Sequence, residues 1–180
     1  REEAPSVIRQ LKGAGFKRIV MMTGDSERTA AAIAKKVGVD DYFSEVLPED
    51  KARFVEEEKA KGRKVIMIGD GINDSPALSA ADAGIAVSEG AEIAREIADI
   101  MIKKDSLDEV VLLRHLSMDL MKRVHGNYRF VISFNLGLIL LGVAGIITPS
   151  MSALLHNSST LAISLKSMTN LLPEEEREEA

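Results

Sequence analysis

The sequence predicts an α/β fold, a parallel sheet with helices on both faces, followed by a hairpin of two transmembrane helices. Up to about Lys104, short apolar runs alternate with charged, helix-forming stretches, which is the pattern of strand–helix–strand units. These apolar runs are continuous rather than alternating, as in strands buried on both faces. Between Arg129 and Leu172, Lys166 is the one charged residue.

The first part of the chain shows clear signals for where elements begin and end. Pro48 and Pro76 stand where helices begin, and Gly38 and Gly62 stand where helices end. A glycine-containing turn at 12–15 precedes the first apolar run. We expect helices over residues 1–16, 26–38, 49–62, 75–81 and 91–98. We expect strands over residues 17–22, 42–47, 64–69, 84–88 and 99–103.

The apolar part is predicted to enter and leave a membrane. Residues 130–148 carry no charge and are long enough to cross a hydrocarbon core as a helix. Basic residues precede them, which places that end in the cytoplasm. A buried helix of a soluble protein is the alternative, but too little chain remains to cover it. The returning segment 152–172 has serines, threonines and His156 on one side and leucines on the other.

These patterns divide the chain into four parts. Residues 1–105 form the α/β part, 106–128 an amphipathic connector helix, 129–172 the two membrane helices, and 173–180 an acidic tail. The net charge of −5 gives no basic surface for nucleic acid. The absence of cysteine excludes disulfides and thiolate metal sites within this sequence.

Polar residues lie beyond the carboxyl ends of three predicted strands, which is where ligands bind in parallel sheets of this kind. Thr23, Gly24 and Asp25 follow the first strand, and the hydroxyl and backbone N–H groups there suit a phosphate. A strand-to-helix turn in which Asp25 or Ser26 is the helix N-cap is the alternative. Lys51 lies in the first turn of a helix, where the dipole disfavours a cation. A bound phosphate would offset that cost; a solvated lysine is the alternative.

The stretch GDGINDSP at 69–76 follows the strongest strand. Its carboxylates, Asp70 and Asp74, offer the hard oxygen ligands that suit Mg²⁺. The alternative is a glycine turn in which Asn73 or Asp74 caps the next helix. Capping accounts for one of these residues but leaves Asp70 without a role.

TGD at 23–25, P-x-D-K at 48–51 and GDGINDSPAL at 69–78, in this order, resemble the phosphorylation domain of P-type ATPases, which has the haloacid-dehalogenase-like fold. AADAGIAV at 80–87 and ADIMI at 98–102 are most similar to the heavy-metal-transporting branch. The resemblance implies ATP and Mg²⁺ as cofactors, with Asp70 as the Mg²⁺ ligand and Asp74 as second choice. It also implies that Asn73 and Asp74 position the loop, that Lys51 neutralises phosphate charge, and that the TGD residues bind phosphate oxygens.

One family motif, D-K-T-G-T with its nucleophilic aspartate, does not occur in the sequence. We therefore expect a fragment that is inactive alone, in a pump that exports a metal cation through an aspartyl-phosphate. We expect an integral protein of the plasma membrane, with the phosphorylation domain and tail cytoplasmic and with lipid, the cation and the pump's other domains as partners. A soluble phosphohydrolase and a non-catalytic membrane partner are the alternatives.

The polar side of 152–172 predicts where the cation binds, because ionisable groups inside a membrane mark ion pathways. In metal-transporting relatives the last helix contributes to the ion site, and HNSST at 156–160 occupies that place. His156 is the expected ligand, with Ser159, Asn157 or Met151 as neighbours; hydrogen bonding between helices is the alternative. Nitrogen and oxygen ligands suit Mn²⁺, Zn²⁺ or Ni²⁺, and copper stays open.

Overall fold

The computed structural model describes residues 2–69, 73–87, 96–102 and 106–171. It divides into two compact units, residues 1–114 and residues 115–180. The predicted strand at 84–88 and the helix at 91–98 fall partly or largely outside the described residues, as do Asp70 and the acidic tail. The four-part division of the chain stays a prediction.

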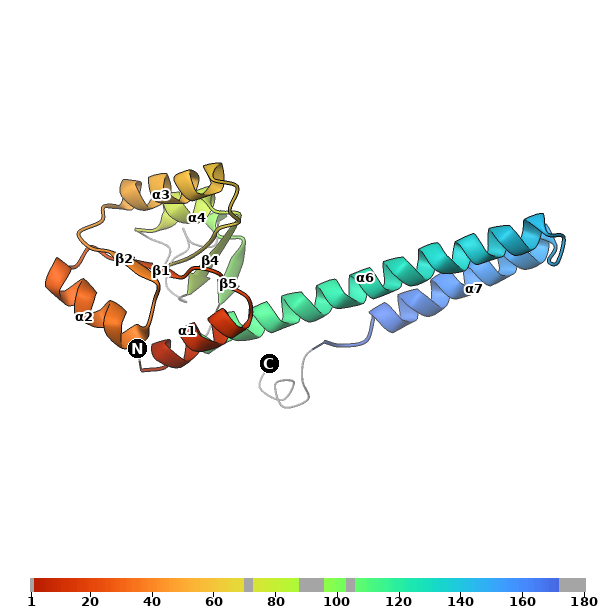
Figure 1. Ribbon diagram of the computed structural model, residues 1–180, viewed down its shortest axis with the longest axis horizontal. Coiled ribbons are helices and arrows are strands. Elements are labelled where there is room, and N and C mark those ends of the chain that lie inside the picture. Colours follow the sequence, from red (N-terminus) through yellow and green to blue (C-terminus); the bar gives the residue numbers. More distant parts are fainter. Residues whose placement is uncertain (1, 70–72, 88–95, 103–105, 172–180) are drawn as a thin grey trace. The chain divides into compact units, whose positions relative to one another are not determined.

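The first unit alternates helices and strands, which confirms the predicted α/β class (Figure 1). Its elements are α1 (Ala4–Gly13), β1 (Val20–Met22), α2 (Glu27–Val37), β2 (Asp41–Phe43), α3 (Pro48–Ala60), β3 (Ile66–Gly69), α4 (Ser75–Ala80), β4 (Ala83–Val87) and β5 (Ile100–Ile102). The strand expected over 42–47 is shorter and ends at Phe43. The backbone turns at Glu45, whose φ of 53° is incompatible with an extended strand.

All described strand pairs are parallel, as the continuous apolar runs predict. The strands form two sheets rather than one: β1 pairs with β2, and β3, β4 and β5 pair in that order. Within the described residues, no ladder joins β1 to β3. Each of these two strands therefore keeps one edge whose backbone groups have no strand partner.

Helices cover both faces of the three-stranded sheet, as predicted. On one face, Val7 and Leu11 of α1 pack with apolar residues of β4 and β5 and with the start of the next helix at Val110 and Val111. On the other face, Met67 of β3 packs against α3 and α4. Ile68, the next residue, packs on the first face, as the two-residue period of a strand requires. Figure 1 shows α1 and the α3–α4 pair on opposite sides of the strands.

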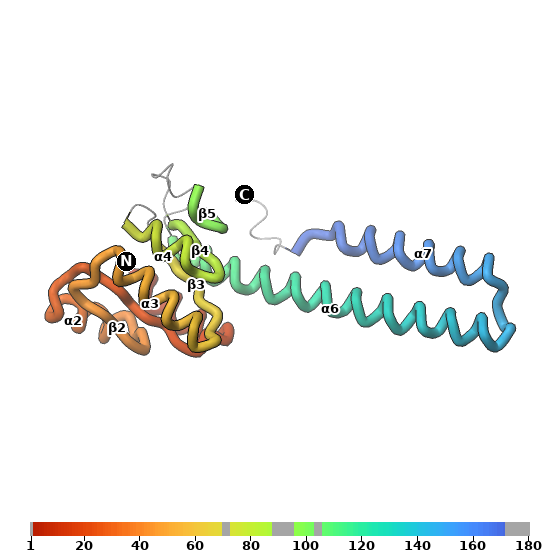
Figure 2. Tube along the Cα trace, turned by 90° about the horizontal axis from the view of Figure 1, so that it is seen from above, coloured from red at the N-terminus to blue at the C-terminus, as the bar shows by residue number. Residues whose placement is uncertain are grey.

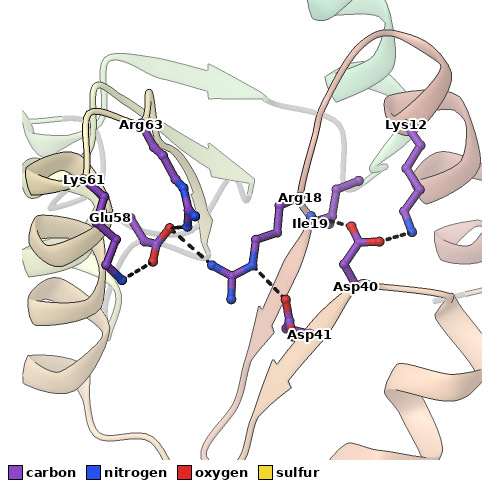
Figure 3. A network of polar contacts seen from close by, with 8 residues as sticks. All are labelled: Lys12, Arg18, Ile19, Asp40, Asp41, Glu58, Lys61 and Arg63. Carbon is purple, nitrogen blue, oxygen red and sulfur yellow. Dashed lines mark hydrogen bonds and ion pairs between the residues drawn. The ribbon is translucent and has the colours of Figure 1, made fainter.

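A buried carboxylate near the end of α3 binds Arg18, which lies just before β1, and so links that segment to the helix (Figure 3). Glu58 is only 5% exposed and accepts hydrogen bonds from Arg18, Lys61 and Arg63. Arg18 also donates to Asp41 at the beginning of β2, with 2.7 Å between Nε and Oδ2. The cations Lys61 and Arg63 lower the pKa of Glu58 from 4.5 to about 2. The carboxylate thus stays charged, because its cost of burial is offset by three cations.

The second unit is a helical hairpin. Helix α6 (Asp108–Val143) begins within the first unit and runs without a break to the hairpin turn, and α7 (Pro149–Ser167) returns beside it. The predicted connector and first membrane segment are therefore one continuous helix. Of the helices in the described residues, α6 alone is both long and apolar enough to cross a membrane. Helix α7 is long enough, but its serine, threonine, asparagine and histidine side chains lower its mean hydropathy.

Polar contacts join α6 to α7, the two helices of the hairpin whose backbone Figure 2 traces. Arg123 donates to the carbonyl of Thr169 at 2.6 Å, just beyond the end of α7. The Nδ2 atom of Asn127 donates to the Ser167 hydroxyl at 2.9 Å. Carbonyls at a helix C-terminus lack partners within the helix, and the Arg123 cation suits the negative end of the α7 dipole.

Candidate active site

An ion pair links α3 to the loop that follows β3. The ammonium Nζ of Lys51 lies 2.6 Å from Oδ1 of Asp74. The two side chains are 15% and 12% exposed, so water screens their attraction little. Lys51 is the fourth residue of α3, close to the predicted first turn. The structure therefore places a cation and a carboxylate together just beyond the carboxyl end of β3.

Asp74 directs its side chain toward Lys51 and not toward its own helix. It occupies the N-cap position of α4, yet its side chain makes no capping hydrogen bond. This finding decides against simple capping as the role of Asp74. The backbone of Gly69 leaves room for the carboxylate, because a Cβ at that position would lie 2.4 Å from Oδ2 of Asp74. Any side chain at Gly69 would displace Asp74.

The TGD loop forms its own set of hydrogen bonds after β1. The Thr23 hydroxyl donates to Oδ2 of Asp25 at 2.8 Å and accepts from the Asp25 backbone N–H. The Thr23 carbonyl accepts from the backbone N–H of Val46, two residues before α3. The loop is thereby held beside the segment that leads to Lys51. A Cβ at Gly24 would meet only the Val46 carbonyl, at 3.9 Å, so this position leaves space for a ligand.

The structure thus brings together some of the predicted site residues. Lys51 contacts Asp74, and Thr23 contacts Asp25; within the described residues, these two groups share no hydrogen bond. Asn73 is exposed, and Asp70 lies outside the described residues. The part of the chain that is described contains no cluster of three or more histidine or carboxylate groups able to hold a metal ion. The roles assigned to Asp70, Asn73 and the TGD residues stay predictions.

Sequence reasoning missed the direct pairing of Lys51 with Asp74. The signal was present, since a lysine near a helix N-terminus is disfavoured by the dipole unless an anion compensates it. The sequence interpretation assigned a bound phosphate to that task. In the structure, the carboxylate of Asp74 performs it.

A second polar contact lies in the hairpin, between α6 and α7. Nδ1 of His156 lies 2.8 Å from Oδ1 of Asn135. The hydroxyls of Ser159 and Thr160 both donate to the backbone carbonyl of His156, at 2.8 and 3.0 Å. His156, Asn157 and Met151 are exposed in the isolated hairpin. The assignment of His156 and Ser159 as ligands of a transported cation stays a prediction.

Comparison with known proteins finds the same kinds of protein that the sequence motifs resemble. Residues 1–82 match the haloacid dehalogenase-like hydrolase family. The chain is 39% identical over 164 residues to a manganese-exporting P-type ATPase of Mycobacterium leprae, covering 91% of this chain and 23% of that protein. It is 40% identical over 164 residues to a zinc-exporting P-type ATPase of Mycobacterium marinum, covering 91% of this chain and 22% of the relative.

A solved structure extends the likeness to three dimensions. The crystal structure of a zinc-transporting PIB-type ATPase in the E2.Pi state matches with a TM-score of 0.78 and 32% identity, over 93% of this chain and 27% of that one. Residues 1–82 are therefore similar to haloacid dehalogenase-like hydrolases, and 91% of the chain is similar to metal-exporting P-type ATPases. It spans about a quarter of the length of the relatives it matches.

Proposed function

We propose that this chain is part of an ATP-driven pump that exports a transition-metal cation through an aspartyl-phosphate intermediate. The observation that carries the proposal is the partly buried ion pair of Lys51 and Asp74 at the carboxyl end of β3. A held lysine in that position suits phosphoryl transfer, which depends on positioning and charge stabilisation. The homology to metal-exporting ATPases supports the same conclusion.

Each site residue has a role in this proposal. Lys51 binds the phosphoryl oxygens and offsets their charge, and Asp74 holds Lys51 in place. Asp70 is the proposed ligand of Mg²⁺, with Asp74 second because one of its oxygens already accepts from Lys51. When bound, Mg²⁺ neutralises charge on the phosphoryl group. Thr23, Gly24 and Asp25 bind phosphate oxygens, and Asn73 orders the loop; ATP is the phosphoryl donor.

The nucleophilic aspartate belongs, in this proposal, to a strand that the rest of the pump supplies. Within the described residues, β1 and β3 each pair with one neighbour, β2 and β4 respectively. An added parallel strand between β1 and β3 would join the two sheets. Its carboxyl end would then bring an aspartate between the TGD loop and the loop after β3. Without that strand, we expect this chain to be inactive by itself.

The hairpin is the proposed cation pathway and lies in the plasma membrane, with the phosphorylation domain and tail in the cytoplasm. Its support is the apolar length of α6 and the polar residues of α7. His156 is the proposed ligand of the transported cation, and Ser159 is a neighbour. The manganese, zinc and copper transporters among the relatives leave the identity of the cation open.

The test uses the complete pump and ATP labelled on the γ-phosphate. We expect Asp70→Asn to abolish turnover of the phosphorylated enzyme, since the substitution removes the carboxylate charge proposed to hold Mg²⁺. A normal turnover rate in this variant would reject the Mg²⁺ assignment. Asp82→Asn is the matched control, because Asp82 lies elsewhere in the same unit and binds Lys64.

The transported cation is tested by ATP hydrolysis across a panel of divalent metals. His156→Ala is expected to lower the stimulation by the transported metal, because it removes the proposed nitrogen ligand. Equal stimulation of the variant and the parent protein by every metal would reduce His156 to a helix-packing residue.

A further inference from the structure

The amide of Asn135 is an unusual group in its surroundings. Residues 130–147 of the predicted membrane segment contain only two side chains with hydrogen-bonding groups, Ser133 and Asn135. An amide in an apolar segment is costly unless it finds a partner. Its partner is the imidazole of His156, across the hairpin, with 2.8 Å between Oδ1 and Nδ1.

The contact through Oδ1 of Asn135 indicates which nitrogen of His156 carries the proton. An amide oxygen only accepts hydrogen bonds, so Nδ1 of His156 must donate. In a neutral imidazole, the other nitrogen, Nε2, then has the free lone pair. The hydrogen bond also limits rotation of the ring, because the Asn135 oxygen holds its Nδ1 edge.

The backbone of His156 is held as well. Ser159 and Thr160, three and four residues later in α7, both donate their hydroxyl protons to the His156 carbonyl. Such bonds from serine and threonine to a preceding carbonyl alter the local helix geometry. The ring and the backbone of this one residue are therefore both constrained, whereas Asn157 next to it has no such described contact.

We propose that Asn135 is a positioning residue that holds His156 as the Nδ1–H tautomer and presents Nε2 to the transported divalent cation. The inference rests on the proposed function, because it takes His156 as the ligand. Asn135 acts through His156 and does not itself bind the cation. Histidine ligands of metals are oriented in this way by a group that accepts a hydrogen bond from their other nitrogen.

The first test reads the tautomer directly and needs no metal. The complete pump is labelled with ¹⁵N-histidine and studied by NMR at alkaline pH. The His156 signals are those that His156→Ala removes. We expect a protonated Nδ1 and an unprotonated Nε2. We expect Asn135→Leu to lose this preference and Asn135→Asp, which keeps an acceptor oxygen, to retain it. A protonated Nε2 in the parent protein would overturn the proposal.

The second test measures ATP hydrolysis against metal concentration. Asn135→Leu is expected to raise the apparent KM for the metal by about 10–100-fold, the usual cost of losing a group that orients a metal ligand, with a smaller change in kcat. Asn127→Leu is the matched control, because it removes another hydrogen bond that an asparagine side chain makes between α6 and α7. An equal effect of the two variants would assign Asn135 to helix packing and overturn the proposal.

The third test is a double-mutant cycle, which separates positioning from direct binding. If Asn135 acts only through His156, adding Asn135→Leu to His156→Ala causes no further rise in KM. A further rise would make Asn135 a ligand and overturn the proposal. If His156→Ala alone changes nothing, the ligand assignment under the proposed function fails and this inference falls with it. A change in His156→Ala but none in Asn135→Leu rejects this inference alone.

Discussion

Lys51 and Asp74 approach to 2.6 Å although 23 residues separate them in the chain. Neither side chain stabilises the helix in which it begins. Lys51 lies near the positive end of the α3 dipole, and Asp74 makes no capping hydrogen bond to α4. Each is placed by the other. The pair also needs the bare backbone of Gly69, against which the Asp74 carboxylate lies. Three positions in two sequence motifs thus form one physical unit.

Replacement of Lys51 tests the function of this unit. In the complete pump, Lys51→Met should lower the rate of phosphoenzyme formation from labelled ATP by about 10²–10³-fold, the usual cost of losing one group that stabilises transition-state charge. Lys36→Met, an exposed lysine of α2, is the control for loss of a positive charge. Equal rates in the two variants would show that Lys51 takes no part in phosphoryl transfer.

Replacement of Gly69 tests the geometry of the unit. Gly69→Ala puts a Cβ 2.4 Å from Oδ2 and 2.7 Å from Cβ of Asp74, so the carboxylate must move away from Lys51. We expect a loss of about 1–3 kcal/mol in the free energy of unfolding from overpacking, measured by denaturant titration, together with lower activity. Gly13→Ala is the control, since no atom lies within 4 Å of its added Cβ. Unchanged stability in Gly69→Ala would contradict the described packing.

The buried carboxylate of Glu58 predicts a pH dependence. Its pKa is about 2 in the folded protein against 4.5 ordinarily, so its pairing stabilises the fold above pH 4.5. This stabilisation is lost as the pH falls from 4.5 through about 2. We expect Glu58→Gln to have a lower Tm than the parent protein at neutral pH, and the gap to narrow in acid.

Thermal unfolding across a pH series measures this effect. Glu57→Gln is the control, because Glu57 is the neighbouring, exposed carboxylate of α3 and should leave the Tm nearly unchanged. A difference in Tm between Glu58→Gln and the parent protein that stays constant from neutral to acid pH would argue against the ion-pair network.

The continuity of α6 predicts coupling between hydrolysis and transport. Insertion of Gly-Gly after Asp119 in the complete pump adds two poor helix formers, each costing about 1 kcal/mol. It also rotates the following residues by about 200°. We expect ATP hydrolysis to continue while metal export, followed in sealed vesicles, is lost. Asp119→Gly controls for flexibility without a change of register. Normal export after the insertion would exclude mechanical coupling through α6.

Much of the fold could be predicted because its signals are local. The apolar runs mark the strands, and Gly38 ends α2 in the left-handed conformation that glycine adopts readily. The end of β2 could not be predicted, because the turn at Glu45 puts a non-glycine residue at positive φ. The division into two sheets also escaped prediction, since strand pairing depends on residues far apart in the chain.

The candidate site was predicted by residue type but not by contact. The sequence identifies Lys51, Asp74 and His156 as polar residues at positions that favour chemistry. It does not reveal that Asp74 pairs with Lys51 or that Asn135 pairs with His156. Both contacts join separate elements, and only the packing of those elements brings the partners within hydrogen-bonding distance.

The split between the β1–β2 and β3–β4–β5 sheets has a consequence for biosynthesis. If an earlier-made strand belongs between β1 and β3, it leaves the ribosome well before its neighbours and must wait for them. Pairing between strands far apart in sequence slows folding, because a long loop must close first. The waiting strand would then expose its edges, so newly made protein should depend on chaperones until β3 has emerged.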